Sequence, residues 1–238
     1  MSSNSPQVST KLAEQIAKHS GNNEPNLCAV TLLGNLVAKP DIRYKTNPVS
    51  AICEITLATH KKWLDKRTNT TKEWTSFHHI MVEGDLVDHI LLKANKGDVI
   101  LVHGYLSHKK NTKVNADIVH ATFIEKFDKG YTESINQIQC SASILSEPKL
   151  LTTENNKKLA QVIVSINQYV YSNNKQAFHR VNIERPIQLW GKQAQHLCDT
   201  AKVDDKLVIE GRLAYSKDSD KAQFIDGKNV HLIKTKQT

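Results

Sequence analysis

Hydrophobic residues in this chain come in short runs that alternate with polar residues and end at turn residues, as β-strands do. Five such runs follow residue 26, at 28–37, 51–59, 78–84, 98–106 and 115–127. Between the third and fourth runs, LVDHILLKANK (86–96) has the apolar spacing of one amphipathic helix. Five strands with a helix between the third and fourth is the order of an OB-fold barrel, and a two-sheet sandwich is the nearest alternative.

The second half of the chain repeats the first, with residue n lying on residue n+107. This offset matches Gly84 with Gly191, Gly104 with Gly211 and His89 with His196. Chance similarity between two β-rich segments is the alternative. We predict an all-β chain of two tandem five-stranded OB-fold barrels, each a β-barrel with a minor helix. The predicted parts are a flexible polar leader (1–26), a first barrel (27–130) and a second, diverged barrel (131–238).

The formal net charge of +8 favours a polyanionic partner. No run of 18 apolar residues occurs, so we expect no membrane span. The first residues lack the apolar core of a secretory signal, which favours a cytoplasmic location. The cysteines are scattered without CxxC pairs, as buried thiols of a reducing compartment would be: Cys28, Cys53, Cys140 and Cys198.

Catalytic chemistry has no support in the sequence. HExxH, Walker and GxSxG motifs are missing, and we expect neither a cofactor nor a metal. His78 and His79 are adjacent strand residues, so their side chains should point to opposite faces and not form a metal pair. The chain is therefore predicted not to be an enzyme.

The segment HKKWLDKRTNTTKEWTSFHH (60–79) places two of the chain's three tryptophans among charged residues. It joins the second and third predicted strands, with RTNTT (67–71) as its tip. In a basic hairpin of this kind, cations contact phosphates while exposed rings stack on unpaired bases. Packing of Trp63 against Trp74 across the hairpin is the structural alternative.

The first repeat resembles a bacterial single-stranded DNA-binding protein of the replicative type, which has one OB-fold per chain. The resemblance covers about 100 residues through TLLGNL (31–36), PDIRY (40–44), ITLAT (55–59), LDKR (64–67), KEW and TSFHH (72–79), VEGDL (82–86) and GDVILVHGYL (97–106). The second repeat resembles the family more faintly, through FHR (178–180), LWG (189–191) and KLVIEGRL (206–213). The resemblance implies binding of single-stranded DNA with little sequence preference, in replication, recombination or repair.

The resemblance also implies the residues that bind. Trp63 and Phe77 match two of the family's base-stacking positions, and Trp190 matches another in the second repeat, where the first repeat has Glu83. Trp74 is a further aromatic residue on the same hairpin. The other predicted nucleic-acid-binding residues are Arg43, Tyr44, Lys61, Lys62, Lys66, Arg67, Lys72, Lys109, Lys110, Tyr169, Tyr171, Phe178, Arg180, Arg212 and Tyr215. Our hypothesis is that the two barrels together make one complete surface.

The sequence departs from the family pattern in two respects. Two barrels per chain, where the family usually assembles four, predict a homodimer, and a monomer with two barrels is the alternative. The ending HLIKTKQT is basic and lacks the family's acidic tip, which puts tail-mediated recruitment of repair enzymes in doubt and suggests a mobile-element or primosome-like accessory protein. RNA binding and a protein-interaction barrel, with the aromatic residues as docking anchors, are the alternative functions.

Overall fold

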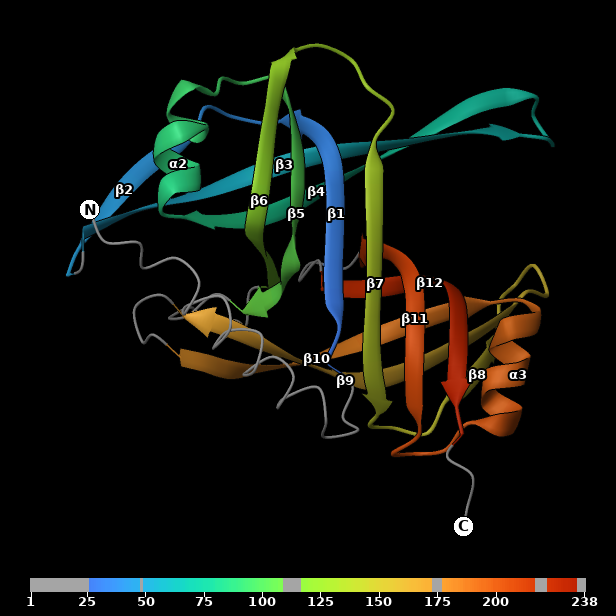
Figure 1. Cartoon of the computed structure of the whole chain (residues 1–238). Coiled ribbons are helices and arrows are strands. Elements are labelled where there is room, and N and C mark those ends of the chain that lie inside the picture. The colour runs from blue at the N-terminus through green and yellow to red at the C-terminus, as the bar shows by residue number, and fades with distance from the viewer. Residues whose placement is uncertain (1–25, 48, 109–116, 173–176, 217–221, 235–238) are drawn as a thin grey trace.

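The computed structural model describes residues 26–47, 49–108, 117–172, 177–216 and 222–234 (Figure 1). The first repeat contains β1 (Cys28–Leu36), β2 (Asp41–Thr46), β3 (Val49–Asp65), β4 (Thr70–Glu83), α2 (Asp85–His89), a 3-10 helix (Leu91–Lys93), β5 (Asp98–His108) and β6 (Asp117–Lys129). The second repeat contains β7 (Ile135–Ile144), β8 (Lys149–Thr152), β9 (Lys158–Ser172), β10 (Ala177–Trp190), α3 (Lys192–Thr200), β11 (Lys206–Tyr215) and β12 (Gln223–Ile233). The predicted leader lies almost entirely outside the described residues.

Each repeat closes into a barrel of five strands. In the first barrel the order is β1-β3-β4-β6-β5, closed by the pairing of Leu36 with Leu57 between β1 and β3. In the second the order is β7-β9-β10-β12-β11, closed by the pairing of Ala142 with Ile166 between β7 and β9. A parallel pair, β4 with β6 and β10 with β12, completes each barrel. The predicted tandem OB-folds are confirmed.

One short strand in each repeat lies outside the barrel. β2 pairs with β3 and β8 pairs with β9, at the two ends of the twelve-stranded sheet. Both strands follow a proline, Pro40 or Pro148, which has no N–H to continue the ladder of the preceding strand. The five hydrophobic runs of the first repeat did not include Asp41–Thr46, so this edge strand and its counterpart β8 were not predicted.

The two barrels are joined through their first strands. β1 and β7 run antiparallel side by side in the middle of the molecule, from Cys28 opposite Cys140 to Leu33 opposite Ile135 (Figure 1). The buried residues of both repeats form one hydrophobic cluster. An antiparallel pair of equivalent strands relates the repeats by an approximate two-fold axis.

Matching glycines confirm the predicted 107-residue offset. Gly84 and Gly191 have φ of 69° and 70° just before α2 and α3, in the left-handed region that favours glycine. Gly104 and Gly211 lie at irregularities in the strand register, where an added Cβ would collide with a carbonyl oxygen of the neighbouring strand. The two repeats therefore share their backbone geometry down to single residues.

Two buried polar clusters link the barrels at equivalent positions, His78 and Arg185. His78 is fully buried, with Nδ1 3.1 Å from the Tyr215 hydroxyl and Nε2 2.8 Å from Thr59 Oγ1. Burial lowers the pKa of His78 to about 4. Arg185 is also buried, and its Nη2 lies 2.6 Å from Asp117 Oδ1 of the first barrel. One cluster is thus built on a neutral ring and the other on an ion pair.

The cysteines and helices complete the description. Cys28, Cys53 and Cys140 are buried, Cys198 is half-buried, and all four thiols are free. In the described ranges, no group of three or more His, Cys, Asp or Glu side chains could hold a metal ion. No helix in the same ranges is both long enough and apolar enough to cross a membrane.

Candidate nucleic-acid interface

The predicted hairpin is a two-stranded ribbon that extends beyond the first barrel (Figure 1). β3 and β4 stay paired to Asp65 and Thr70, so the turn is shorter than predicted. Every second residue of β3 up to Thr59 points into the barrel. Beyond the barrel, Lys61 and Trp63 lie on this same face of β3. Trp74 is paired with Lys61 and therefore shares this face.

All three tryptophans of the chain line one groove of about 710 Å³. Trp63 and Trp74 come from the ribbon of the first barrel, and Trp190 comes from the end of β10 in the second. These rings keep 41%, 47% and 45% of their surface exposed, respectively. The remaining lining residues are Lys61, Gln188, Arg212, Ala214, Tyr215, Ser216, Phe224 and Asp226. The groove is therefore composite, with walls from both repeats.

Two cations, Lys61 and Arg212, line this composite groove. Partial burial and the nearby Arg212 guanidinium lower the pKa of Lys61. Arg212 is held by Asp226, whose Oδ2 accepts hydrogen bonds from Nε at 2.7 Å and Nη2 at 2.6 Å. Lys72, opposite Trp63 on the ribbon, forms an ion pair with Asp65. Flat rings with fixed cations beside them suit a strand of stacked bases and charged phosphates.

Tyr215 lines the composite groove but is also part of the junction between the barrels. It is half-buried, its ring lies 5.6 Å from the His78 ring between centroids, and its hydroxyl accepts a hydrogen bond from Gln223 Nε2 at 3.1 Å. Burial raises the pKa of Tyr215 to about 12. That the Tyr215 ring binds nucleic acid stays a prediction.

Other predicted residues of the first repeat lie away from the composite groove. Phe77 is exposed but pairs with Ala58, on the opposite face of the ribbon from Trp63. Lys62 is on that opposite face too, and its Nζ lies 4.7 Å from the centre of the Tyr131 ring. Arg43 forms an ion pair with Asp41 within β2, and Tyr44 donates a hydrogen bond to Asp88 of α2. Lys66 and Arg67 lie in the turn of the ribbon.

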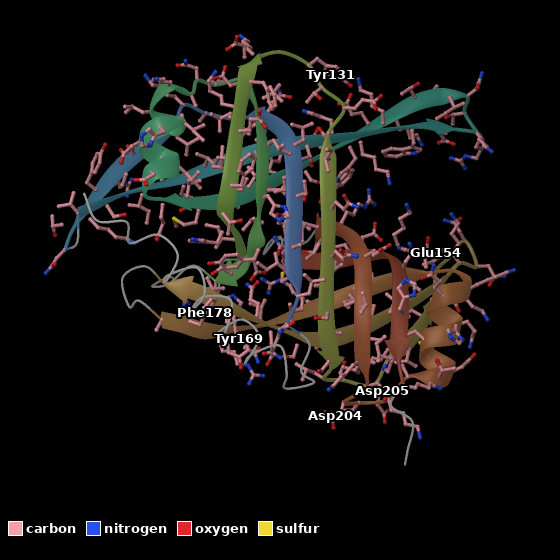
Figure 2. All side chains as sticks on the ribbon, viewed as in Figure 1. Tyr131, Glu154, Tyr169, Phe178, Asp204 and Asp205 are labelled. Carbon is pink, nitrogen blue, oxygen red and sulfur yellow. The ribbon has the colours of Figure 1, made fainter. Side chains whose placement is uncertain are left out.

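In the second repeat the structure separates the predicted aromatic residues. Tyr169 is paired with Arg180, and Tyr171 with Phe178, at the end of the β9–β10 ribbon. Figure 2 shows Tyr169 and Phe178 at the side of the molecule away from α3, whereas only Gly191 separates Trp190 from α3. Lys109 and Lys110 lie outside the described residues.

Sequence reasoning missed Phe224 and Gln188 of the composite groove. Phe224 lies in β12 between two barrel-facing residues, Gln223 and Ile225. Because residues of a strand alternate between its two faces, the sequence pattern of β12 could have predicted that Phe224 points away from the barrel.

On the other side of the two-fold axis, a counterpart surface has the same backbone and different side chains. The 107-residue offset places Gln168 on Lys61, Val170 on Trp63, Val181 on Trp74, Glu83 on Trp190 and Tyr105 on Arg212. The β9–β10 ribbon contacts the first barrel there, because Gln168 Nε2 donates to the Leu106 carbonyl at 3.0 Å. Glu83 forms an ion pair with Lys45 at 2.8 Å. The counterpart surface thus has no tryptophan and carries a carboxylate.

A composite groove of tryptophans and cations on tandem OB-folds defines a class of protein that holds unpaired nucleic acid. The chain belongs to the single-strand binding protein family, whose sequence model matches residues 27–124 and 135–232. Membership in a family of binding proteins also confirms the prediction that the chain is not an enzyme.

Solved structures with the same tandem fold come from Thermus aquaticus. A deletion variant of its single-stranded DNA binding protein is 21% identical, with a TM-score of 0.73 over 90% of this chain and 98% of that one. The wild-type protein gives 20% identity and a TM-score of 0.72 over 90% and 97%. At this identity the similarity establishes the tandem fold.

Proposed function

We propose that this protein binds single-stranded DNA, with little sequence preference, along the composite groove between its two barrels. The observation that carries this proposal is that Trp63 and Trp74 of the first repeat converge with Trp190 of the second repeat on one groove, which Lys61 and Arg212 also line. Each stacked base contributes about 1–3 kcal/mol whatever its identity, because every base has a π-face. Phosphate contacts add affinity that weakens with salt.

Quenching of tryptophan fluorescence by dT oligomers at two salt concentrations tests this proposal. Wild type should be quenched strongly, since all three rings line the groove, and the quenching should weaken as salt rises. Trp63→Ala should bind more weakly, while Phe77→Ala, on the opposite face of the ribbon, is the matched control. Absence of quenching at low salt would contradict the proposal, and equal affinity for RNA would widen the substrate class.

The resemblance supports further predictions about this protein's role. Protection of single strands in replication, recombination or repair fits a sequence-tolerant groove. A homodimer would bring together four barrels, and its mass can be measured by light scattering. The cytoplasmic, nucleoid-associated location and the mobile-element or accessory role stay predictions that depend on this binding activity.

A further inference from the structure

A second hollow, of about 800 Å³, adjoins the composite groove at Trp190. Trp190 lines both the composite groove and the second hollow, so a DNA strand that stacks on this ring could extend into either of them. The walls of the second hollow are the turn between β8 and β9, the glycine after Trp190 and one face of α3. Its other lining residues are Asn156, Lys157, Lys158, Gly191, Lys192, Gln195, His196 and Asp199.

Three exposed lysines make this second hollow basic. Lys158 Nζ donates to Gln195 Oε1 at 2.6 Å. Within the described part of the chain, Lys157 and Lys192 form no ion pair. Among the described residues that line this hollow, Asp199 is the one carboxylate, and it accepts a hydrogen bond from Gln195 at 2.6 Å.

The equivalent place in the first repeat has the opposite charge. The 107-residue offset puts Ser50 on Lys157, Ala51 on Lys158, Asp85 on Lys192 and Asp88 on Gln195. The backbone is shared, since Gly84 donates to the Ala51 carbonyl at 2.8 Å just as Gly191 donates to that of Lys158 at 2.9 Å. The same fold therefore carries lysines beside Trp190 and aspartates beside Glu83.

We propose that single-stranded DNA continues from the composite groove across Trp190 into the second hollow, where Lys157, Lys158 and Lys192 bind its phosphates. This inference rests on the proposed function and adds a second segment to the same binding path. Exposed lysines complement the charge of phosphates, whereas the aspartates beside Glu83 would repel phosphates at the equivalent place in the first repeat.

The test compares the salt dependence of binding for a double variant and a matched control. Lys157→Gln with Lys192→Gln removes two charges and spares Lys158, which holds Gln195. Lys93→Gln with Lys96→Gln removes the same charge beside α2 of the first barrel. Labelled dT oligomers of about 5 and about 15 nucleotides, near the limits of the range for one OB-fold, are titrated by fluorescence anisotropy at several salt concentrations.

With the longer oligomer, the double variant should reduce the slope of log affinity against log salt by about 1.4, or about 0.7 for each lost phosphate contact. The slope for the shorter oligomer and for the control should match wild type. An unchanged slope with the longer oligomer, or an equal fall in the control, would overturn the extension. An equal fall with the shorter oligomer would place the lysines in the primary site and also overturn it. Failure of wild type to bind either oligomer would instead refute the proposed function itself.

Discussion

On each side of the molecule a ribbon from one barrel crosses the other barrel, and the two sides carry opposite chemistry. The composite groove has Trp63, Trp74 and Trp190, whereas the counterpart surface has two valines and Glu83 at those positions. In a dimer of identical barrels, any substitution appears on both sides of the axis. Because these repeats share one chain, each side has changed separately, and the single chain can confine binding to one side.

The largest expected effect concerns the two buried polar clusters that link the barrels, one around Arg185 and one around His78. Arg185→Met should destabilise the protein by about 3–5 kcal/mol, because Asp117, whose side chain is 18% exposed, would lose its cation. Urea unfolding measures this change. Adding Asp117→Asn should recover much of the loss, and a cost below about 1 kcal/mol for the single variant would show that the ion pair does not anchor the barrels.

The cluster around the neutral His78 ring should instead make the stability of the protein depend on pH. The pKa of His78 is about 4 in the folded protein, whereas an unperturbed histidine has a pKa of about 6.5. Between these two pH values the unfolded chain therefore binds a proton that the folded protein does not. Stability should fall by about 3 kcal/mol as the pH drops from about 6.5 to about 4, and be fully present above that window.

The matching experiment is urea unfolding of His78→Gln across the same pH window. Its slope with pH should be shallower than that of wild type. The pKa of His120 is also lowered by burial, so a smaller residual slope is expected in the variant. Identical slopes for both proteins would rule out His78 as the source.

A smaller effect is expected on binding. Trp63→Ala and Trp190→Ala should each weaken dT binding by about 1–3 kcal/mol, roughly 5- to 150-fold, by removing one stacking platform. The equivalent truncation Val170→Ala, on the counterpart surface, should leave affinity within about twofold. Fluorescence anisotropy with a labelled oligomer measures all three, and a comparable loss in Val170→Ala would break the proposed distinction between the sides.

The smallest effect should come from the carboxylate of the counterpart surface. Glu83→Gln removes a charge that repels phosphate, but it supplies no ring on which a base can stack. The dT affinity should therefore rise by about 0.5 kcal/mol or less, as expected for one exposed charge. A tenfold gain would mean that the counterpart surface also lies on the binding path.

Much of the fold could be predicted because it depends on local patterns. Strand alternation, the helix after Gly84 and the 107-residue offset are all visible along the sequence. The edge strands were missed because they are short and mostly exposed, so they lack the hydrophobic alternation of the barrel strands.

The site could be predicted only in part, because its geometry depends on long-range register. The sequence identified Trp63 and Trp190, but whether Phe77 shares a face with Trp63 depends on which residues pair across the ribbon. The meeting of the ribbon with Trp190 depends on the antiparallel pairing of β1 with β7, which no local pattern encodes. Tyr169 and Phe178 were predicted to bind with Trp190, but the structure places them at the opposite end of the β9–β10 pair from Trp190.

The sharing of one groove by both barrels is tested most directly by calorimetric titration with a dT oligomer of about 10 nucleotides, within the range for one OB-fold. Wild type, Trp63→Ala and Trp190→Ala are compared for stoichiometry and affinity. A shared groove predicts one oligomer per chain in all three proteins, with weaker affinity in both variants. Two oligomers per wild-type chain, one of them lost in each variant at unchanged affinity for the other, would mean that the barrels bind independently.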